Sequence, residues 1–318
     1  MDLIYTDAGR VDQGVLSAYS LDLSFGASEN NFQMTVGIAE AVLEFKSIIY
    51  MEGTEYGGMV GIKKTRTNNG SITYEGRTWH GILNSKVLEP SAGNAYLTAS
   101  GEANGVIGIL IERMGLSGLF VASEESSGIN ISNYRFHRYC KGYDGLKAML
   151  AANGAKLKIE WKNKSVRLSA VPIVDYTATP VDGDEADLSV EQHETKVNHL
   201  ICLGAGNLAE REVIHLYADQ SGNIGDTQYF FGLDEVAEVY DNSNSEDIRS
   251  DGVKRFKELL DKDKAEISLP EDGEPTYDIG DIVGATELRS GVSASSAVTQ
   301  KIVRINNGVV STEYKTGS

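Results

Sequence analysis

The stretch from Gly57 to Pro90, GGMVGIKKTRTNNGSITYEGRTWHGILNSKVLEP, constrains the fold more than any other part of the sequence. Residues 59–67 mix apolar and basic side chains, and the Asn69-Gly70 pair supplies the positive φ angles that a tight hairpin turn requires. Residues 71–76 form the returning arm of this predicted hairpin. Proline cannot continue a helix or a strand ladder, so Pro90 ends the element before it. We therefore expect a domain boundary at Pro90.

A turn centred on Asn69-Gly70 also sets the register of the two arms. It places Lys64 opposite Glu75 and Arg66 opposite Thr73. Opposite charges directly across a strand pair attract each other, so this register has no electrostatic cost.

Glycine-rich composition indicates a chain built mainly from strands and tight turns. The 318 residues include 34 glycines and only 5 prolines, and segments rich in Tyr, Thr and Val alternate with polar residues. Apolar residues make up 41% of the chain, which is enough for real cores in two or three domains. We expect an α+β, mainly β fold with two barrel-like antiparallel β modules and an α+β insertion.

The charge balance argues against a surface that binds nucleic acid. Lys and Arg number 29 against 46 Asp and Glu, a formal charge of −17, whereas phosphate binding needs a basic surface. Cys140 and Cys202 belong to no metal-spaced cluster. The N-terminal MDLIYTDAGR lacks the pattern of a signal peptide, and no run reaches the ~18 apolar residues that span a bilayer. We expect a protein without a membrane span that is made and assembled in a cytoplasm.

Residues 1–90 are predicted to form the N-terminal β-barrel-like module. Alternating or strand-like patterns occur at residues 15–23, 32–36 and 47–51. Glu40 and Glu44 lie in a stretch, residues 39–45, that could begin a helix.

Residues 91–176 are predicted to form the α+β insertion domain. Apolar residues at helical spacing predict two helices, over residues 105–116 and 143–152. Asn153-Gly154 provides a left-handed cap for the second helix. Alternation predicts two strands of a hairpin, over residues 156–161 and 166–171. Asn163-Lys164 is the turn between them.

Residues 177–318 are predicted to form a second β-barrel-like module with an inserted helix near residues 245–262. An acidic, turn-rich linker over residues 180–187 opens this part. Alternation predicts strands over residues 195–203, 210–217, 277–283, 298–305 and 309–314.

Two motifs in this last part suggest cofactor or metal binding and are better explained otherwise. Residues 204–209, GAGNLA, match G-x-G-x-x-[GA], but a dinucleotide site needs a helix next, and residues 211–217 alternate as a strand does. We expect these glycines to turn a hairpin. A possible zinc set consists of His193, His199, Cys202 and His215. Its spacing matches neither H-E-x-x-H nor paired cysteines, so we interpret these residues as strand surface and edge positions.

Residues 241–252, DNSNSEDIRSDG, resemble a calcium loop only superficially. Glu246 stands where such a loop requires Gly, and Gly252 stands where it requires a bidentate Glu, so we interpret the stretch as a helix N-cap. The linker acids Asp182, Asp184 and Glu185 show no sign of the burial that glycosidase chemistry needs. His137 and Cys140 lie three residues apart on a predicted strand, on opposite faces. We therefore expect no catalytic, cofactor-binding or metal-binding residues and no cofactor.

Three blocks of the chain together resemble the tail-hub family of long-tailed bacteriophages and prophages. The first block contains Glu75-Gly76-Arg77, Ile82-Leu83, Lys86 and Pro90, with Thr78 and Trp79 where the family has Asp and Leu. The second is the helix and hairpin over residues 144–171, and the third is the G-D-apolar-apolar strand and closing hairpin over residues 277–314. This family is similar to the baseplate hub of contractile-tailed phages and to the hub part of type VI secretion spike proteins.

The resemblance implies a structural virion protein, not an enzyme, that closes the distal end of a tail tube. It implies a homotrimer in which two barrel-like modules per chain form a pseudo-sixfold ring. The partners would be the distal tail protein, the tail tube and a spike, fibre or lysin, and the location would be the virion tail. Arg77 and Trp79 are then expected in packing and subunit contact.

Two other functions stay open at this point. The first alternative is a carbohydrate-binding or host-surface adhesion module of a tail tip, which would use exposed aromatic side chains. The second, a peptidoglycan hydrolase, has the least support, because the sequence contains no catalytic constellation.

Overall fold

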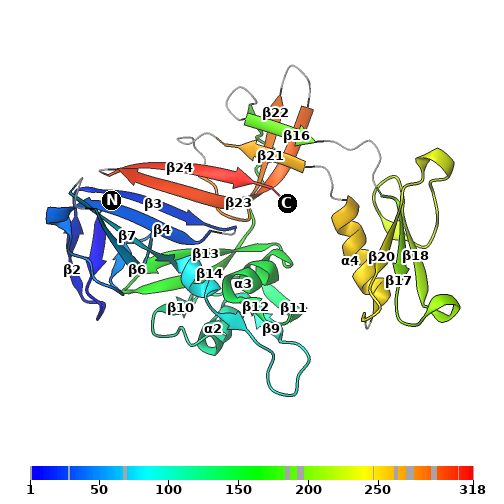
Figure 1. Ribbon diagram of the computed structural model, residues 1–318, viewed down its shortest axis with the longest axis horizontal. Coiled ribbons are helices and arrows are strands. Elements are labelled where there is room, and N and C mark those ends of the chain that lie inside the picture. The colour runs from blue at the N-terminus through cyan, green and yellow to red at the C-terminus, as the bar shows by residue number, and fades with distance from the viewer. Residues whose placement is uncertain are drawn as a thin grey trace. The chain divides into compact units, whose positions relative to one another are not determined.

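The structure is a computed structural model that describes residues 2–27, 29–66, 70–182, 187–191, 197–245, 247–260, 264–269, 276–287, 292–306 and 308–317. The chain folds into two compact units. Unit 1 comprises Met1–Leu188 and Ile267–Ser318, and unit 2 comprises Ser189–Glu266. Strands are the commonest element (Figure 1), which confirms the α+β, mainly β class. The expected boundaries at residues 90 and 176 stay a prediction.

An eleven-stranded sheet forms the framework of unit 1. Its strands are, in spatial order, β15 (Val181–Asp182), β22 (Ile282–Glu287), β23 (Val292–Asn306), β3 (Tyr19–Phe25), β4 (Asn31–Gly37), β7 (Ser71–Thr78), β6 (Gly57–Arg66), β5 (Ile48–Tyr50), β1 (Leu3–Thr6) and β2 (Asp12–Leu16), with β24 (Val309–Thr316) beside β23. Neighbours run antiparallel except β15 and β22. Figure 1 shows that the sheet curls. Because β23 pairs with β3, the first and last strands of the chain share one sheet.

The inner face of this sheet buries a core of its own. Burial alternates along β3 and β4, as the two-residue period of a strand requires, and Leu23, Phe25 and Phe32 lie in the core. The strand predicted over residues 15–23 is interrupted, because β2 ends at Leu16 and β3 begins at Tyr19. In the stretch where a helix could begin, the structure has only a 3₁₀ turn, η1 (Ile38–Glu40).

β6 and β7 form the predicted hairpin, and its turn residues 67–69 lie outside the described part of the chain. The predicted register is wrong. The observed partners are Lys64 with Thr73 and Arg66 with Ser71. The ladder is irregular at Gly61, which has no partner in β7, and a glycine inside a strand is a common site for such a bulge. Lys64 still forms an ion pair with Glu75 from its shifted position.

β7 leads directly into α1 (Trp79–Asn84), a helix that the sequence pattern did not predict. Thr78 caps it, because its Oγ1 accepts a hydrogen bond from the backbone N–H of Gly81 at 3.4 Å. Trp79 is fully buried and stacks on Trp161, with 5.3 Å between ring centroids. This burial confirms a packing role for Trp79.

Two helices pack on a three-stranded sheet in the middle of the chain, and both were predicted. They are α2 (Ala103–Arg113) and α3 (Gly142–Ala151). The sheet consists of β10 (Phe120–Ala122), β14 (Ser165–Pro172) and β13 (Ala155–Lys162). β13 and β14 are the predicted hairpin, with φ of 53° at Asn163 and 61° at Lys164. Two small ladders complete this part, β8 (Val87–Leu88) with β12 (Cys140–Lys141) and β9 (Thr98–Glu102) with β11 (Asn130–Arg135).

Within the described residues, no helix combines the length and apolar character that crossing a membrane requires.

The described part of unit 2 contains a four-stranded sheet with an α-helix against one face. The sheet order is β19 (Ile224–Gly225), β18 (Val213–Ala218), β17 (His199–Leu203) and β20 (Ala237–Asp241), and α4 (Ile248–Leu260) shares its core. α4 confirms the helix predicted near residues 245–262. A further ladder pairs β16 (Asp187–Glu191) with β21 (Lys264–Ser268).

The end of the chain returns to the large sheet as a long hairpin. β23 and β24 confirm the predicted closing strands, and the turn residue Asn307 lies outside the described part. The strand predicted over residues 277–283 is displaced, because β22 begins only at Ile282. The preceding residues form a turn that holds Asp278 and Asp281.

Candidate functional site

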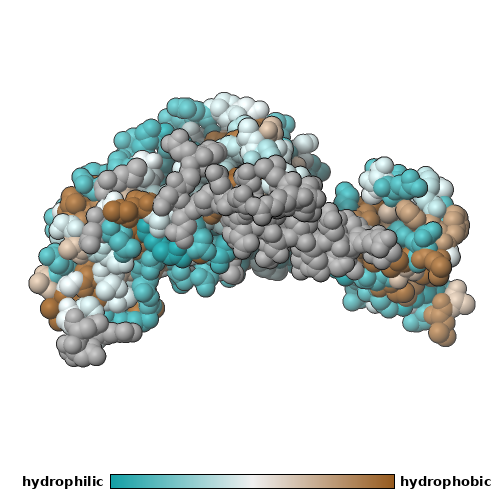
Figure 2. Space-filling view, turned by 90° about the horizontal axis from the view of Figure 1, so that it is seen from above, coloured by the Kyte–Doolittle hydropathy of each residue, from teal (hydrophilic) through white to brown (hydrophobic). Residues whose placement is uncertain are grey.

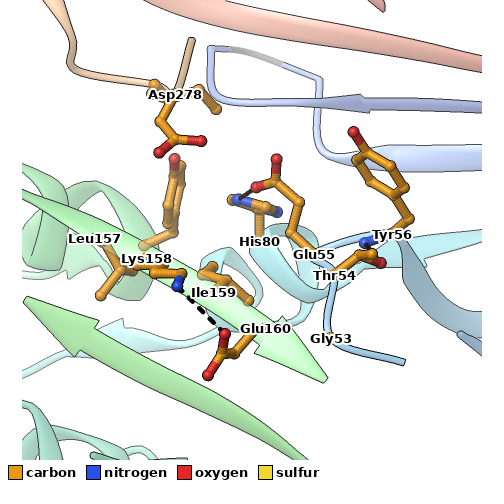
Figure 3. A pocket seen from close by; sticks show the side chains of 12 residues that line it. Gly53, Thr54, Glu55, Tyr56, His80, Leu157, Lys158, Ile159, Glu160 and Asp278 are labelled. Carbon is orange, nitrogen blue, oxygen red and sulfur yellow. Dashed lines mark hydrogen bonds and ion pairs between the residues drawn. The ribbon is translucent and has the colours of Figure 1, made fainter. Parts of the chain in front are cut away.

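A small pocket in unit 1 lies where the N-terminal strands, the central hairpin and the C-terminal strands meet. Its volume is about 210 Å³, and its walls come from the turn after β5, from α1, from β13 and from the turn before β22. Figure 3 shows Glu55 and His80 pointing toward one another, with Asp278 on the opposite side. The charged side chains around this pocket determine its electrostatics and therefore its chemistry.

Lys301 brings a positive charge from β23 to this junction. Its Nζ lies 2.7 Å from Glu55 Oε1 and 3.9 Å from Asp278 Oδ1, and its side chain is buried. Burial by itself would lower the pKa of Lys301, but the nearby Glu55 and Tyr56 outweigh burial and raise that pKa. Lys301 is therefore charged and ties the last long strand to the turn after β5.

Lys156 makes the same kind of contact from β13. Its Nζ lies 2.7 Å from both carboxylate oxygens of Asp281 and 2.9 Å from Asp278 Oδ2. Burial alone would lower the pKa of Lys156, and its hydrogen bonds to Asp281 and Asp278 reverse this and raise it. Asp278 thus lies between the two lysines, with one oxygen facing each.

Asp281 is almost fully buried and uses both of its oxygens. Oδ1 also accepts a hydrogen bond from the backbone of Val174, and Oδ2 accepts one from the backbone of Asp278, both at 2.9 Å. A buried carboxylate with this many donors costs little, because its charge and its lone pairs are satisfied. Asp281 therefore anchors the end of the central hairpin to the start of β22.

His80 brings an imidazole to the junction, and it is uncharged. It is 2% exposed, stacks on Phe25 with 4.6 Å between ring centroids and meets Tyr143 edge-on at 5.1 Å. Burial, with smaller contributions from Lys301 and Lys147, lowers the pKa of His80 to about 3. Its Nε2 lies 3.6 Å from Glu55 Oε2, which is too far for a hydrogen bond.

Chemically, this arrangement holds segments together rather than presenting a reactive group. Lys301 and Lys156 between them contact all three carboxylates, those of Glu55, Asp278 and Asp281, and His80 is held neutral. Removing one member of such a buried network leaves an uncompensated charge. The junction is therefore a lock that joins three parts of unit 1.

One sequence signal could have identified this lock. Lys301 lies in β23 at the same parity as Val303 and Ile305, which are fully buried. A lysine on the buried face of a strand needs a buried carboxylate nearby. The partner Glu55 lies 246 positions away in sequence, so no local pattern could name it.

The glycines of residues 204–209 join β17 to β18, and these strands run antiparallel. This confirms the hairpin interpretation over the dinucleotide interpretation. His199 and His215 lie on these strands, with 2.8 Å between His199 Nε2 and His215 Nδ1. The other ring nitrogen of His199 lies 2.6 Å from Glu235 Oε1, a partner that the sequence did not suggest.

Cys202, the third described member of the possible zinc set, lies on the other face of the sheet. Its Sγ would lie 2.4 Å from a Cβ placed on Gly252 of α4, so it packs against the helix. His193 lies outside the described residues. Across the described ranges, no three or more His, Cys, Asp or Glu side chains form a group that could hold a metal ion.

The remaining candidate motifs are placed as follows. Asp247 Oδ1 accepts a hydrogen bond from the backbone of Ser250 at 3.0 Å, as expected for a residue that caps α4. Glu246 of that stretch and the side chains of the linker acids lie outside the described residues. Cys140 is in β12, whereas His137 lies in the turn before it, so the single strand predicted for both is wrong.

Comparison with known proteins gives the fold a context. No protein-family model and no curated protein matches the chain. Among solved structures, prophage tail protein gp18 from Listeria monocytogenes EGD-e matches with a TM-score of 0.56 and 12% identity, covering 100% of this chain and 94% of that chain. The 43 kDa tail protein of prophage MuSo2 from Shewanella oneidensis matches with a TM-score of 0.57 and 9% identity, covering 99% and 98%.

A chain of the phage P2 baseplate, solved in its activated conformation with Ca, matches with a TM-score of 0.51 and 10% identity, covering 99% of this chain and 98% of that chain. At these identities the likeness establishes the fold: the chain has the fold of prophage tail proteins and of a phage baseplate component.

Proposed function

We propose that this chain is a structural virion protein, the tail hub that closes the distal end of a phage or prophage tail tube. It connects the tube, with its distal tail protein, to a spike, fibre or lysin. The observation that carries the proposal is the extent of the fold match. Tail and baseplate chains from separate sources align over 94–98% of their own length and over 99–100% of this chain.

A homotrimeric ring is part of the proposal, and the edges of the large sheet support it. Among the described strands, β2 pairs only with β1, and β24 pairs only with β23. Both strands carry exposed apolar side chains, including Val15 on β2 and Val309 on β24. Figure 2 shows such apolar surface among hydrophilic residues at the end of unit 1 that the N-terminal strands form. Exposed, apolar strand edges favour association with further chains.

The buried lock supports a structural role rather than an enzymatic one. Its ion pairs join the turn after β5, the central hairpin and the last long strand, so that unit 1 can transmit load without its parts separating. A ring that ends a tail tube needs subunits of this kind. In this proposal the protein resides in the virion tail after assembly in the bacterial cytoplasm.

Exposed aromatic side chains favour one alternative, an adhesion module that binds host carbohydrate. Tyr229 and Phe231 are exposed on unit 2, in the connection between β19 and β20. Aromatic faces are common platforms for sugar rings. A glycan array separates the two functions, because specific hits that Tyr229→Ala and Phe231→Ala abolish would favour adhesion.

Native mass spectrometry of the full chain tests the ring. We expect a species of three times the 34.4 kDa chain mass that dissociates on dilution. A chain that stays monomeric up to tens of micromolar, a range well above the Kd of a stable interface, would contradict the trimer.

A further inference from the structure

The outer face of the large sheet in unit 1 contains a groove that the lock does not use. Its floor is formed by β4, β7 and β6, and its volume is about 990 Å³. Phe45 and Lys46 wall it on one side. Ile82 of α1, Lys86 just after the end of that helix, and Leu116 also line it.

Several apolar side chains in this groove are exposed. Phe45 is 62% exposed and Ile62 is 49% exposed, while Ile82 and Leu116 are half-buried. Gly61 contributes no side chain to the groove. A Cβ placed on Gly61 would lie 4.0 Å from its nearest neighbour, the carbonyl oxygen of Glu75, so there is open space above it. The groove therefore offers apolar contact area that a partner could cover.

The charged residues of the groove are mostly basic. Lys46, Arg77 and Lys86 line it, and within the described part of the chain none of the three forms an ion pair with an acidic side chain. Among the described lining residues the one acid is Glu75, and it is already paired with Lys64. A basic groove of this kind attracts an acidic surface, and the chain, with a formal charge of −17, has many acidic side chains to supply one.

The edge strand β2 has the complementary chemistry. Val11, just before it, is 60% exposed, and Val15 is 55% exposed. Asp12 follows Val11 in sequence and accepts a hydrogen bond from Tyr50 at 2.9 Å. Asp7, four positions before Val11, accepts a hydrogen bond from the backbone of Val11 at 2.9 Å. Burial and then Asp12, with Glu52, raise the pKa of Tyr50 to about 12, which places Glu52 in the same acidic neighbourhood.

The edge strand cannot fill the groove of its own chain. Arg10, in the turn before β2, donates a hydrogen bond to the carbonyl oxygen of Gly118 and so fixes the turn. The backbone of β2 is also hydrogen-bonded to β1 along one edge. In addition, β5 and β1 lie between β2 and β6 in the sheet. An acidic edge and a basic groove that cannot meet within one chain can meet between two chains.

We infer that the groove over β4, β7 and β6 receives the acidic edge strand β2 of a second copy of this chain. The valines of the edge would cover the exposed Phe45 and Ile62, and its carboxylates would face Arg77 and the two lysines. The contact is heterologous, since different surfaces meet, and such a contact repeats until a ring closes. This inference rests on the proposed trimer and names the surfaces that would build it.

The test uses one variant for each side of the contact. Gly61→Leu fills the groove, and Val15→Lys puts a positive charge on the edge, where lysine is well tolerated. The matched controls are Gly37→Leu, another strand glycine with open space around its Cβ, and Ile109→Lys, an exposed residue of α2. Native mass spectrometry and sedimentation velocity report the assembly of each full-length chain.

We expect each blocking variant to weaken self-association about tenfold or more, and neither control to change it. A mixture of the two blocking variants is the decisive sample. The Val15→Lys chain keeps an intact groove and the Gly61→Leu chain keeps an intact edge, so one contact can form between them. The mixture should give a one-to-one dimer and no trimer, although each variant alone is monomeric.

A charge variant guards against a local folding defect. Arg77→Glu reverses a groove charge without adding bulk, and Lys162→Glu, on an exposed position of β13, is its control. Raising the ionic strength from about 0.15 M to about 1 M shortens the Debye length from about 8 Å to about 3 Å, and should weaken the wild-type assembly.

The outcomes separate the inference from the function. If the wild type is a trimer and Gly61→Leu, Val15→Lys and Arg77→Glu all remain trimers, the inferred contact is overturned while the ring stands. If the wild type is monomeric, the proposed ring is contradicted, and the inferred contact between chains is contradicted as well.

Discussion

The neutral, buried His80 makes the stability of unit 1 depend on pH in a direction that can be worked out from the structure. In the unfolded chain a histidine binds a proton below pH 6.5, whereas burial lowers the pKa of His80 in the folded chain to about 3. Between these values the unfolded state binds one more proton than the folded state. The free energy of unfolding is therefore complete above pH 6.5 and decreases as the pH falls toward 3.

The size of this effect follows from the separation between the two pKa values. Each pH unit below 6.5 costs about 1.4 kcal/mol, so lowering the pH from 7 to 5 should remove about 2 kcal/mol of stability through His80 alone. Other groups also titrate in this range. Burial raises the pKa of Glu55, for example, and its contribution has the opposite sign, because its stability is lost as the pH rises through that pKa.

Comparison with His80→Phe isolates the histidine. Phenylalanine keeps a flat ring against Phe25 and cannot titrate, while the other groups remain. Urea unfolding at pH 7 and pH 5, followed by tryptophan fluorescence, is the assay. Both tryptophans of the chain, Trp79 and Trp161, lie in unit 1, so the signal reports the unit that contains the site.

We expect the wild type to lose about 2 kcal/mol more than His80→Phe between pH 7 and pH 5. Equal losses in the two chains would refute the reasoning, because they would mean that His80 binds protons equally in the folded and unfolded states. The measured quantity is a difference between pH values, so any constant cost of the substitution cancels.

Two further predictions concern the lock and the strand glycines. Lys301→Met should lower the free energy of unfolding by about 3–5 kcal/mol, because Glu55 is left as a buried, unpaired charge. Adding Glu55→Gln should restore part of that loss in the same urea assay. If the double variant recovers no stability, the two residues are not coupled. Gly76→Ala should prevent stable folding, because a Cβ there would lie 2.0 Å from the carbonyl oxygen of Met59. Gly61→Ala, which has open space around its Cβ, should change the stability by only about 1 kcal/mol or less in thermal melts. Equal melting temperatures for the two variants would contradict this geometry.

Elements fixed by local chemistry could be predicted from the sequence. The hairpin of β13 and β14 follows from strict alternation and from a turn in which Asn163 and Lys164 both take positive φ. α2, α3 and α4 follow from apolar residues at helical spacing. In each case the residues that determine the element lie within one short stretch of the sequence.

Elements fixed by distant contacts could not be predicted in this way. The break in the β6–β7 ladder at Gly61 is one case, because the alternation does not reveal it. The register nearer the turn was wrong for a local reason, since Arg66 pairs with Ser71 and residues 67–70, not Asn69-Gly70 alone, connect the two strands. The turn that displaced the predicted strand before β22 exists because Asp281 binds Lys156, a residue 125 positions earlier. The lock shares this property, since its lysines and carboxylates come from segments that only the folded chain brings together.

The position of the chain in an intact particle tests the central claim most directly. The measurement is electron microscopy of phage particles made by the genome that encodes this chain, with a small tag inserted near Leu208, in the exposed connection between β17 and β18, and labelled with gold. The hub function predicts label only at the distal end of the tail tube, with threefold-symmetric density there in averaged images. Label along fibres, on the capsid or absent from complete particles would contradict it.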